Sequence, residues 1–316
     1  MEQYKQLVKF VLENGESRED RTGVGTLSVF GTQDRYDLRD GFPLVTLKKT
    51  HFSSIVKELL WFLRGETNIK TLGCGIWDQW ANEVGELGPV YGKQWRDWEW
   101  RDVDGGMNGY GSCDHGYNSE DQIKELIQNL KSDPMSRRHV VSAWNLADLS
   151  QMRLQPCHIM FQCYASEIPK GERATSKRIW RTRAFLGANG FETTVADPNP
   201  KYYLDLQLYQ RSCDLLLGAC FNIASYSLLL MLLAREVNMI PRFFIHTIGD
   251  AHIYLNHLEG AKEMLTREPL PLPSVTIADK PLPYPGCPRD GSVLEPEDFQ
   301  LENYQHHPFI KLEVAV

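Results

Sequence analysis

The spacing of apolar and polar residues divides the chain into helical and strand-like segments. Apolar residues recur three and four positions apart in segments that predict amphipathic helices over residues 4–12, 53–63, 121–130 and 258–265. Alternating β-branched and aromatic residues predict strands over residues 26–38, 139–144, 158–165, 203–209 and 243–248. Residues 223–236 are apolar on nearly all faces, as expected of a helix at the centre of a core. This pattern predicts a single mixed α/β domain over residues 1–316.

Two segments interrupt this pattern and are expected to be surface insertions. Residues 101–118 are rich in Gly and Asp, so we expect an exposed loop there. Residues 167–200 begin basic, then become rich in Gly, Asn and Pro, and lie between two predicted strands, which indicates a long hairpin extension. This extension is either a solvated decoration or a contact with a partner or a second subunit. Frequent prolines in residues 269–296 leave room only for short strands.

Composition restricts the class of protein and its location. A net charge of -7 argues against a general nucleic-acid binder, which is usually basic. Seven cysteines without a repeated spacing do not indicate a disulfide framework, and the first residues lack a charged and then apolar leader. The longest apolar run, residues 227–234, is much shorter than the ~20 residues of a membrane span. We therefore expect a cytoplasmic protein without a membrane partner.

Several side chains carry candidate chemistry, each with a simpler alternative. Cys157 immediately precedes the strand predicted over residues 158–165. A thiolate is a soft nucleophile suited to conjugate addition, although a buried cysteine is often only a core residue. The guanidinium groups of Arg137, Arg138 and Arg211 suit phosphate oxygens, the alternative being that they are simply solvated. Glu58 interrupts an apolar helical pattern, which predicts either general acid–base catalysis or a structural ion pair.

A second group of residues is suited to reading a nucleoside. Asn222 lies in an otherwise apolar run, and its amide donor and acceptor match the imide edge of uracil; the alternative is a helix N-cap. His252 and Tyr254 follow Gly249-Asp250-Ala251 and can bind a sugar hydroxyl. A nucleophilic thiol, anion-binding guanidinium groups and a base-reading amide together predict an enzyme that acts on a phosphorylated heterocycle.

These residues fall in blocks that resemble the thymidylate synthase family. The blocks follow the family's order along nearly the whole chain, and so many ordered matches do not arise by chance. They are residues 20–23 (DRTG), 58–63 (ELLWFL), 76–81 (IWDQWA), 88–92 (GPVYG), 136–138 (SRR), 156–158 (PCH), 210–214 (QRSCD), 221–226 (FNIASY), 249–254 (GDAHIY) and 314–316 (VAV).

The resemblance implies the family's fold and reaction. The expected fold is a three-layer α/β (α+β) structure whose large mixed sheet forms the face of a symmetric homodimer. The expected reaction is the reductive methylation of dUMP to dTMP, with 5,10-methylenetetrahydrofolate as the one-carbon and hydride donor and without a metal. Each active site would combine residues of both subunits, so the dimer would be required for activity.

Carried over residue by residue, the resemblance assigns the catalytic and nucleotide-binding groups. Cys157 would add to C6 of dUMP, Glu58 would move protons through water, and Tyr91 would help to remove the C5 proton. The expected catalytic set is Cys157, Glu58, Tyr91, Arg211, Asn222 and Asp214. The expected dUMP-binding set, with Arg137 and Arg138 donated by the partner subunit, is Arg21, Arg137, Arg138, His158, Gln210, Arg211, Ser212, Asp214, Asn222, His252 and Tyr254.

The resemblance also implies a site in which the folate stacks over the nucleotide. Asp214 would meet the pterin and Lys48 the glutamate tail, while Ala315 and Val316 would close over the folate as a lid. The expected folate-binding set is Lys48, Ile76, Trp77, Trp80, Leu154, Asp214, Gly218, Phe221 and Ala315.

The sequence departs from the family's usual pattern without losing a catalytic group. Cys220 stands where proline is common, Cys163 and Ala165 replace an aromatic residue and Val, and the extension over residues 167–200 is absent from shorter relatives. Some phage relatives deliver water instead of hydride, so 5-hydroxymethyl-dUMP is the alternative product. Asn222, where cytidylate-specific relatives have Asp, favours uracil for either product.

The remaining expectations concern the product and secondary partners. Trp77, Trp80 and the terminal Ala315-Val316 are retained, which favours hydride transfer and the methyl product. Secondary binding of RNA is an alternative role, because basic side chains in residues 170–183 can contact phosphates. If a phage encodes the chain, the expected location is the cytoplasm of its host.

Overall fold

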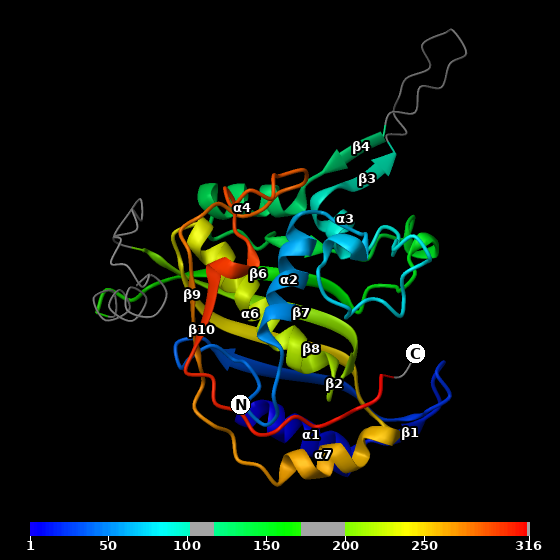
Figure 1. The fold of residues 1–316 in the computed structure, drawn as a ribbon. Helices are drawn as coiled ribbons and strands as arrows, with labels where there is room; N and C mark the ends of the chain where they lie inside the picture. Colours follow the sequence, from blue (N-terminus) through cyan, green and yellow to red (C-terminus); the bar gives the residue numbers. More distant parts are fainter. Residues whose placement is uncertain (102–116, 172–199, 315–316) are drawn as a thin grey trace.

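The centre of the protein is a mixed β-sheet that crosses the middle of Figure 1. The structure, a computed structural model, describes residues 1–101, 117–171 and 200–314, and within them this sheet has six strands in the order β1-β2-β8-β7-β6-β5. The strands are β1 (Glu16–Arg18), β2 (Thr26–Asp37), β5 (Val140–Ser142), β6 (His158–Glu167), β7 (Tyr202–Asp214) and β8 (Ile240–Tyr254). Neighbours pair antiparallel except β7 and β8, which are parallel. The predicted α/β fold with a large mixed sheet is confirmed.

Helices and two small sheets surround this centre. In Figure 1, α2 and α6 lie in front of the large sheet, α1 and α7 lie below it, and α3 and α4 lie above. The helices are α1 (Glu2–Asn14), α2 (Phe52–Leu63), α3 (Tyr91–Arg96), α4 (Gln122–Ser132), α6 (Gly218–Glu236) and α7 (Leu258–Leu265), with short 3-10 helices η1 (Ile69–Thr71), η2 (Leu149–Gln151), η3 (Leu255–His257) and η4 (Pro296–Asp298). The small sheets pair β3 (Trp98–Arg101) with β4 (Tyr117–Glu120) and β9 (Ser274–Ile277) with β10 (Phe299–Glu302).

Helix α6 is the core helix that the sequence predicts. It packs against β7, β8 and α2, and its central residues are buried. Its 19 residues are long and apolar enough to cross a membrane, yet 83% of the apolar window is buried inside the protein, as in the core helix of a soluble protein. The helix begins at Gly218 rather than at residue 223, because Asp214 Oδ1 accepts hydrogen bonds from the backbone N–H groups of Leu216 (2.8 Å) and Leu217 (3.2 Å).

Strands β7 and β8 continue beyond their predicted ends at residues 209 and 248. Polar residues there interrupt the apolar alternation, but both strands persist because they pair with each other as far as Asp214. Gly249 permits this close pairing, since a Cβ atom at that position would lie 2.7 Å from the carbonyl oxygen of Arg211. The extension matters because these strand ends carry several of the candidate site residues.

The other predicted helices and strands are confirmed with shifted ends, apart from three differences. Strand β5 covers only part of the predicted residues 139–144. Strand β1 and helix α3 were not predicted, because β1 has only polar residues and α3 is too short to show a helical period. Helix α3 packs closely on the turn that follows α2, where a Cβ atom on Gly92 would lie 2.5 Å from the carbonyl oxygen of Glu66.

The two predicted insertions are described only at their ends. The expected loop over residues 101–118 is wrong at its edges, since β3 and β4 pair there as a hairpin. Strands β6 and β7 pair as far as Glu167 and Tyr202, which agrees with a long hairpin. Residues 102–116 and 172–199 lie outside the described residues. The proline-rich residues 269–296 contain the short strand β9, as predicted.

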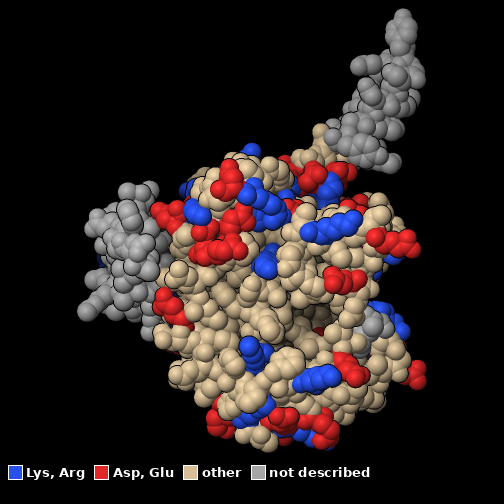
Figure 2. Space-filling model, viewed as in Figure 1, with Lys and Arg blue, Asp and Glu red and all other residues tan. Residues whose placement is uncertain are grey.

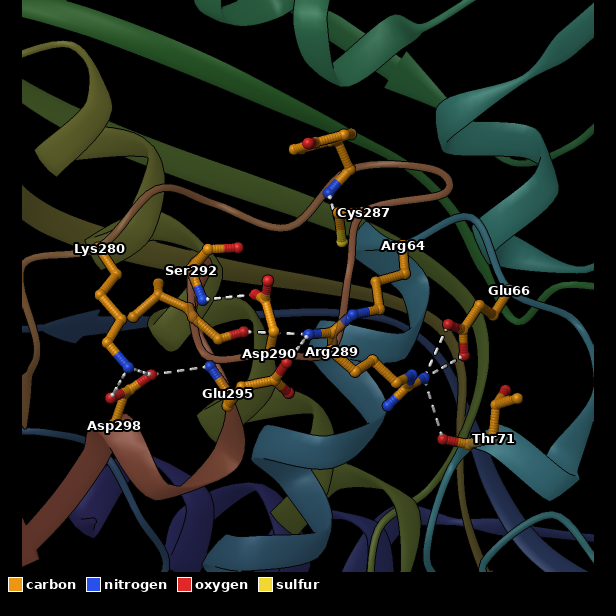
Figure 3. A network of polar contacts seen from close by, with 12 residues as sticks. Arg64, Glu66, Thr71, Lys280, Cys287, Arg289, Asp290, Ser292, Glu295 and Asp298 are labelled. Atoms are coloured by element: carbon orange, nitrogen blue, oxygen red, sulfur yellow. Dashed lines mark hydrogen bonds and ion pairs between the residues drawn. The ribbon is translucent and has the colours of Figure 1, made fainter.

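Ion pairs with a later segment of the chain fix the C-terminal end of α2 (Figure 3). The buried Arg64 guanidinium lies 2.9 Å from a carboxylate oxygen of Glu295, and Arg289 lies 2.7 Å from Glu66 in the turn after the helix. Breaking a buried ion pair by removing one partner is strongly destabilising, so the Arg64–Glu295 contact holds the helix end, while the more exposed Arg289–Glu66 pair adds little. The same helix carries Glu58 one and a half turns earlier.

Candidate active site

Cys157 lies immediately before β6, in a loop held by hydrogen bonds from two directions. Its backbone N–H donates to the Tyr91 hydroxyl oxygen at 2.9 Å, and its carbonyl oxygen accepts from the backbone N–H of Arg211 at 2.8 Å. The Arg211 guanidinium donates to the carbonyl oxygens of Pro156 (2.9 Å) and Gln155 (3.0 Å). These bonds attach the cysteine loop to α3 and to β7, so the thiol has a fixed position.

The charges around Cys157 do not by themselves produce a thiolate. Burial raises the pKa of the thiol, and the positive charges of Arg211 and Arg21 lower it by less, so the pKa lies above its ordinary value. The sequence predicts that Arg211 favours the thiolate, and its charge acts in that direction, but burial outweighs it. Since the thiolate is the nucleophilic form, the resting thiol needs a proton acceptor before it can attack.

Two of the predicted phosphate-binding arginines converge on this site. Arg211 uses two of its five N–H donors on carbonyl oxygens, which leaves donors for an anion. Arg21 is held by a tight turn in which the Asp20 carboxylate accepts backbone hydrogen bonds. Burial raises the pKa values of both Cys157 and Tyr254, and the charge of Arg21 opposes both shifts, so Arg21 lies close to both groups.

The other two arginines lie elsewhere in the same chain. Arg137 and Arg138 are exposed beside the edge strand β5 and line a surface pocket of about 290 Å³. The carbonyl oxygen of Arg137 accepts from the side chain of Gln162, four residues beyond the start of β6 at His158. At ~3.3 Å per residue this is ~13 Å along the strand from the cysteine end.

Glu58 is buried in α2 and accepts a hydrogen bond from the indole N–H of Trp77 at 2.7 Å. Burial raises the pKa of this carboxyl to about 7, and the Trp77 hydrogen bond opposes the shift. Among the described residues Glu58 has no ion-pair partner within 4.0 Å, so the structural ion pair considered from the sequence is not formed. A carboxyl of this pKa can both donate and accept a proton near neutral pH.

The raised pKa of Glu58 predicts a pH-dependent stability of the fold. Because the folded pKa is about 7 and the ordinary value 4.5, ionised Glu58 destabilises the fold increasingly as pH rises through this window, by about 3 kcal/mol above it. Glu58→Gln should therefore raise the melting temperature markedly at pH ~8 and only slightly at pH ~5. Thermal unfolding of both proteins at the two pH values checks this, and an equal shift at both would contradict it. The exposed Glu302→Gln is the matched control.

Asn222 lies in the second turn of α6, so the N-cap alternative is wrong; Leu217 occupies that position. Its amide oxygen accepts from the Gln210 side chain at 3.0 Å. Beside it, burial lowers the pKa of His158 to about 4 against the smaller opposing effect of the nearby Asn222 side chain, so the imidazole is neutral. The Tyr91 ring lies 5.0 Å from the His158 ring. The structure thus places an uncharged polar surface next to the cysteine loop.

His252 and Tyr254 lie together at the end of β8, with ring centroids 5.3 Å apart. Burial lowers the pKa of His252, but the neighbouring Asp250 carboxylate and the charge of Asp214 outweigh it, and the net shift is upward. The Asp250 carboxylate lies 3.5 Å from His252 Nδ1. Burial raises the pKa of Tyr254, and the proximity of Asp214 and Cys157 adds to this rise, so the rings of His252 and Tyr254 border the same site as Cys157.

The predicted folate-binding residues fall into three groups. Ile76, Trp80, Leu154 and Phe221 are partly buried and pack against the core, and Trp77 is fixed by Glu58. Gly218 begins α6, and Asp214 serves the turn before it, a structural task that the sequence analysis did not include. Lys48 is only 4% exposed, and its predicted contact with the glutamate tail stays a prediction. Ala315 lies outside the described residues.

Sequence reasoning did not single out His246 or Asp250. His246 is 1% exposed in the middle of β8, and its Nε2 lies 2.8 Å from the amide oxygen of Gln210. A histidine within an apolar strand pattern requires a hydrogen-bond partner, and that signal was available in the sequence. Asp250 could have been found as the nearest carboxylate to His252 on the same strand.

The structure brings Cys157 together with two arginines on one side and with uncharged polar and aromatic side chains on the other. Figure 2 shows a hollow on the face of the molecule that carries α2 and α6, bordered mainly by uncharged side chains, as a stacked aromatic substrate requires. The family model described as thymidylate synthase matches residues 2–316, and the chain belongs to this family. The family implies a methyltransferase-type enzyme of nucleotide biosynthesis that uses methylenetetrahydrofolate. Among the described residues no group of three or more His, Cys, Asp or Glu is placed to hold a metal ion.

Proposed function

We propose that this protein is a thymidylate synthase that converts dUMP to dTMP with 5,10-methylenetetrahydrofolate. The observation that carries the proposal is the placement of Cys157 between Tyr91 and Arg211, with Arg21 near the thiol. A nucleophile beside two guanidinium groups fits a substrate whose electrophilic ring is tethered to a phosphate. The buried Asn222 amide supplies the contact that reads the base.

Cys157 adds through its sulfur to C6 of the pyrimidine, and the electrons of the C5–C6 double bond move towards the C4 carbonyl oxygen. Asn222 and the neutral His158 surround that carbonyl side with uncharged polar groups. C5 would bond to the one-carbon unit that the folate supplies, and the folate's hydride would reduce this unit to a methyl group, releasing dihydrofolate. Loss of the C5 proton and departure of the Cys157 sulfur then restore the ring.

Tyr91 and Glu58 divide the proton transfers. Burial raises the pKa of Tyr91, so its phenol stays protonated and orients a proton acceptor at C5 rather than acting as the base. Glu58, with a pKa of about 7, accepts and returns protons through water. The indole of Trp77 holds one of its carboxylate oxygens at 2.7 Å and so fixes the direction of this exchange.

The packing around the unusual residues supports the methyl product over the hydroxymethyl product. Cys163 and Cys220 are fully buried, and Ala165 is nearly so. Cys220 Sγ lies 3.1 Å from the Tyr4 hydroxyl, within the core beneath the site. These departures from the family pattern therefore lie inside the core rather than at an exposed surface, and the ring centroids of Trp77 and Trp80 lie 5.7 Å apart.

The proposed reaction is tested by incubating the purified protein with dUMP and methylenetetrahydrofolate. We expect dihydrofolate, followed by its ultraviolet absorbance, and dTMP, identified by its mass, in equal amounts. Protein carrying Cys157→Ser is the control for uncatalysed conversion. Hydroxymethyl-dUMP formed with tetrahydrofolate would assign the hydroxymethylase reaction instead, and no consumption of dUMP would contradict both.

The proposed active unit is a homodimer formed through the outer face of the large sheet. Val140, Tyr164 and Tyr209 are between 36% and 51% exposed, and their strand partners place them on one face of neighbouring strands. Arg137 and Arg138 lie beside this face and ~13 Å along β6 from the cysteine end, which fits donation to a partner's site. We place this dimer in the cytoplasm.

A further inference from the structure

Behind Asn222 a chain of buried hydrogen bonds links two residues of the expected dUMP-binding set, Gln210 and Asn222, to His246, which has no role in the motifs. His246 Nε2 lies 2.8 Å from Gln210 Oε1, and Gln210 Nε2 lies 3.0 Å from Asn222 Oδ1. The same nitrogen lies 3.0 Å from the backbone carbonyl oxygen of Ser212. His246, Gln210 and Asn222 are only 1%, 3% and 7% exposed, so water does not compete for these groups.

The Ser212 carbonyl decides the direction of every bond in this chain. A carbonyl oxygen only accepts, so the Gln210 atom beside it must be the NH2 group. The amide oxygen of Gln210 then faces His246, whose Nε2 must carry the hydrogen. The second N–H of Gln210 points at Asn222, so the Asn222 atom facing it must be the carbonyl oxygen.

This direction leaves the NH2 group of Asn222 free to donate on its other side. Reversing the Asn222 amide would place its N–H groups against those of Gln210 in a buried space. Such a buried, unpaired donor costs about 1–3 kcal/mol, a roughly tenfold to hundredfold change in an equilibrium.

We propose that Gln210, oriented by Ser212 and His246, is the residue that makes this site select uracil over cytosine. The proposal rests on the proposed function, because it concerns the base of the nucleotide substrate. Uracil offers a C4 carbonyl acceptor and an N3–H donor, which match an outward Asn222 NH2 and the amide oxygen beside it. That oxygen accepts from Gln210 at 3.0 Å, and the Cys213 thiol, a weak donor, lies 3.9 Å from it. Cytosine offers an N4 donor and an N3 acceptor, which require the reversed amide.

The selection does not change with pH in the physiological range. Burial and the nearby His158 lower the pKa of His246 to about 3, and burial lowers that of His158 to about 4. Both imidazoles are therefore neutral near pH ~7, and the hydrogen on His246 Nε2 stays in place.

The first test compares Gln210 variants by calorimetric titration with dUMP and with dCMP. In Gln210→Met, which fixes neither orientation, the ratio of the dCMP to the dUMP dissociation constant should fall roughly tenfold to hundredfold. In Gln210→Glu the carboxyl carries at most one hydrogen in place of the two of the NH2 group, and the Ser212 carbonyl takes it. Asn222 then faces an acceptor oxygen and turns its NH2 inward, so the ratio should fall further than in Gln210→Met. His246→Phe should lower the ratio less than either, since the Ser212 contact remains.

The ratio separates this role from a structural one. If both dissociation constants rise equally and the ratio stays at its wild-type value, the proposal is overturned. The exposed Gln300→Glu is a matched control and should leave the ratio unchanged. If the wild-type protein binds neither nucleotide, the proposed function fails with the proposal; if it binds dUMP while the variants keep the ratio, only the proposal fails.

A second measurement tests the direction of the chain without any ligand. Nitrogen NMR of the free protein, labelled at histidine and assigned with His246→Phe, distinguishes a protonated from an unprotonated Nε2. We expect His246 with a hydrogen on Nε2. A hydrogen on Nδ1 alone would reverse Gln210 and overturn the proposal.

Discussion

Replacing Cys157 with serine is expected to lower kcat by ~10,000-fold or more while dUMP remains bound. A serine hydroxyl is a far weaker nucleophile than a thiolate and has no base within the described hydrogen bonds of this residue to activate it. The contacts of Arg211 with Pro156 and Gln155 do not involve the sulfur, so the phosphate side of the site should persist. Steady-state kinetics and calorimetric titration with dUMP measure the two quantities separately.

The control for Cys157→Ser is Cys287→Ser, because Cys287 is also free and only partly buried but lies in the segment that packs on α2. This control should keep its activity. Turnover near the wild-type level in Cys157→Ser would exclude Cys157 as the nucleophile. The rate at which Cys157 is alkylated, measured as a function of pH, is a further check. This rate should increase only at pH values above the ordinary pKa of a thiol, because burial raises the pKa of Cys157. In Arg211→Met the increase should occur at still higher pH, because the charge that lowers this pKa is removed.

Two inactive variants are expected to form an active protein when they share a dimer. One subunit carries Cys157→Ser, and the other carries Arg137→Ala and Arg138→Ala. In the hybrid, the subunit that keeps Cys157 receives intact arginines from its partner, so one of its two sites is complete. Random association makes half of the dimers hybrid, so the unsorted mixture should have about a quarter of the wild-type activity and the purified hybrid about half.

The experiment uses co-expressed subunits with different tags, so that hybrid dimers are purified before the assay. Mixing the two finished homodimers without exchange is the control and should give no activity. Hybrids that form but remain inactive would show that Arg137 and Arg138 serve their own subunit. That outcome would leave the long separation along β6 between Gln162 and the cysteine end without a functional meaning.

The sequence determined which residue types are present and in what order, and this was enough for the fold class and the candidate chemistry. Helix α6 and most strands follow from local periodicity, since side chains three, four or two positions apart share a face. The ordered blocks around Cys157 and Asn222 indicated the family, and the match over residues 2–316 shows it.

Only the tertiary structure decided how these residues are tuned. Strands β7 and β8 continue through polar residues because each pairs with the other, a contact between segments far apart in the chain. Burial raises the pKa of Glu58 to about 7. At Cys157, the rise in pKa caused by burial is larger than the fall caused by the charge of Arg211. Both effects depend on the whole fold, because the fold decides which groups are buried. The Ser212 carbonyl fixes the direction of Gln210, and through it that of Asn222. A sequence names donors and acceptors, but protonation and hydrogen-bond direction depend on the neighbours that folding brings within reach.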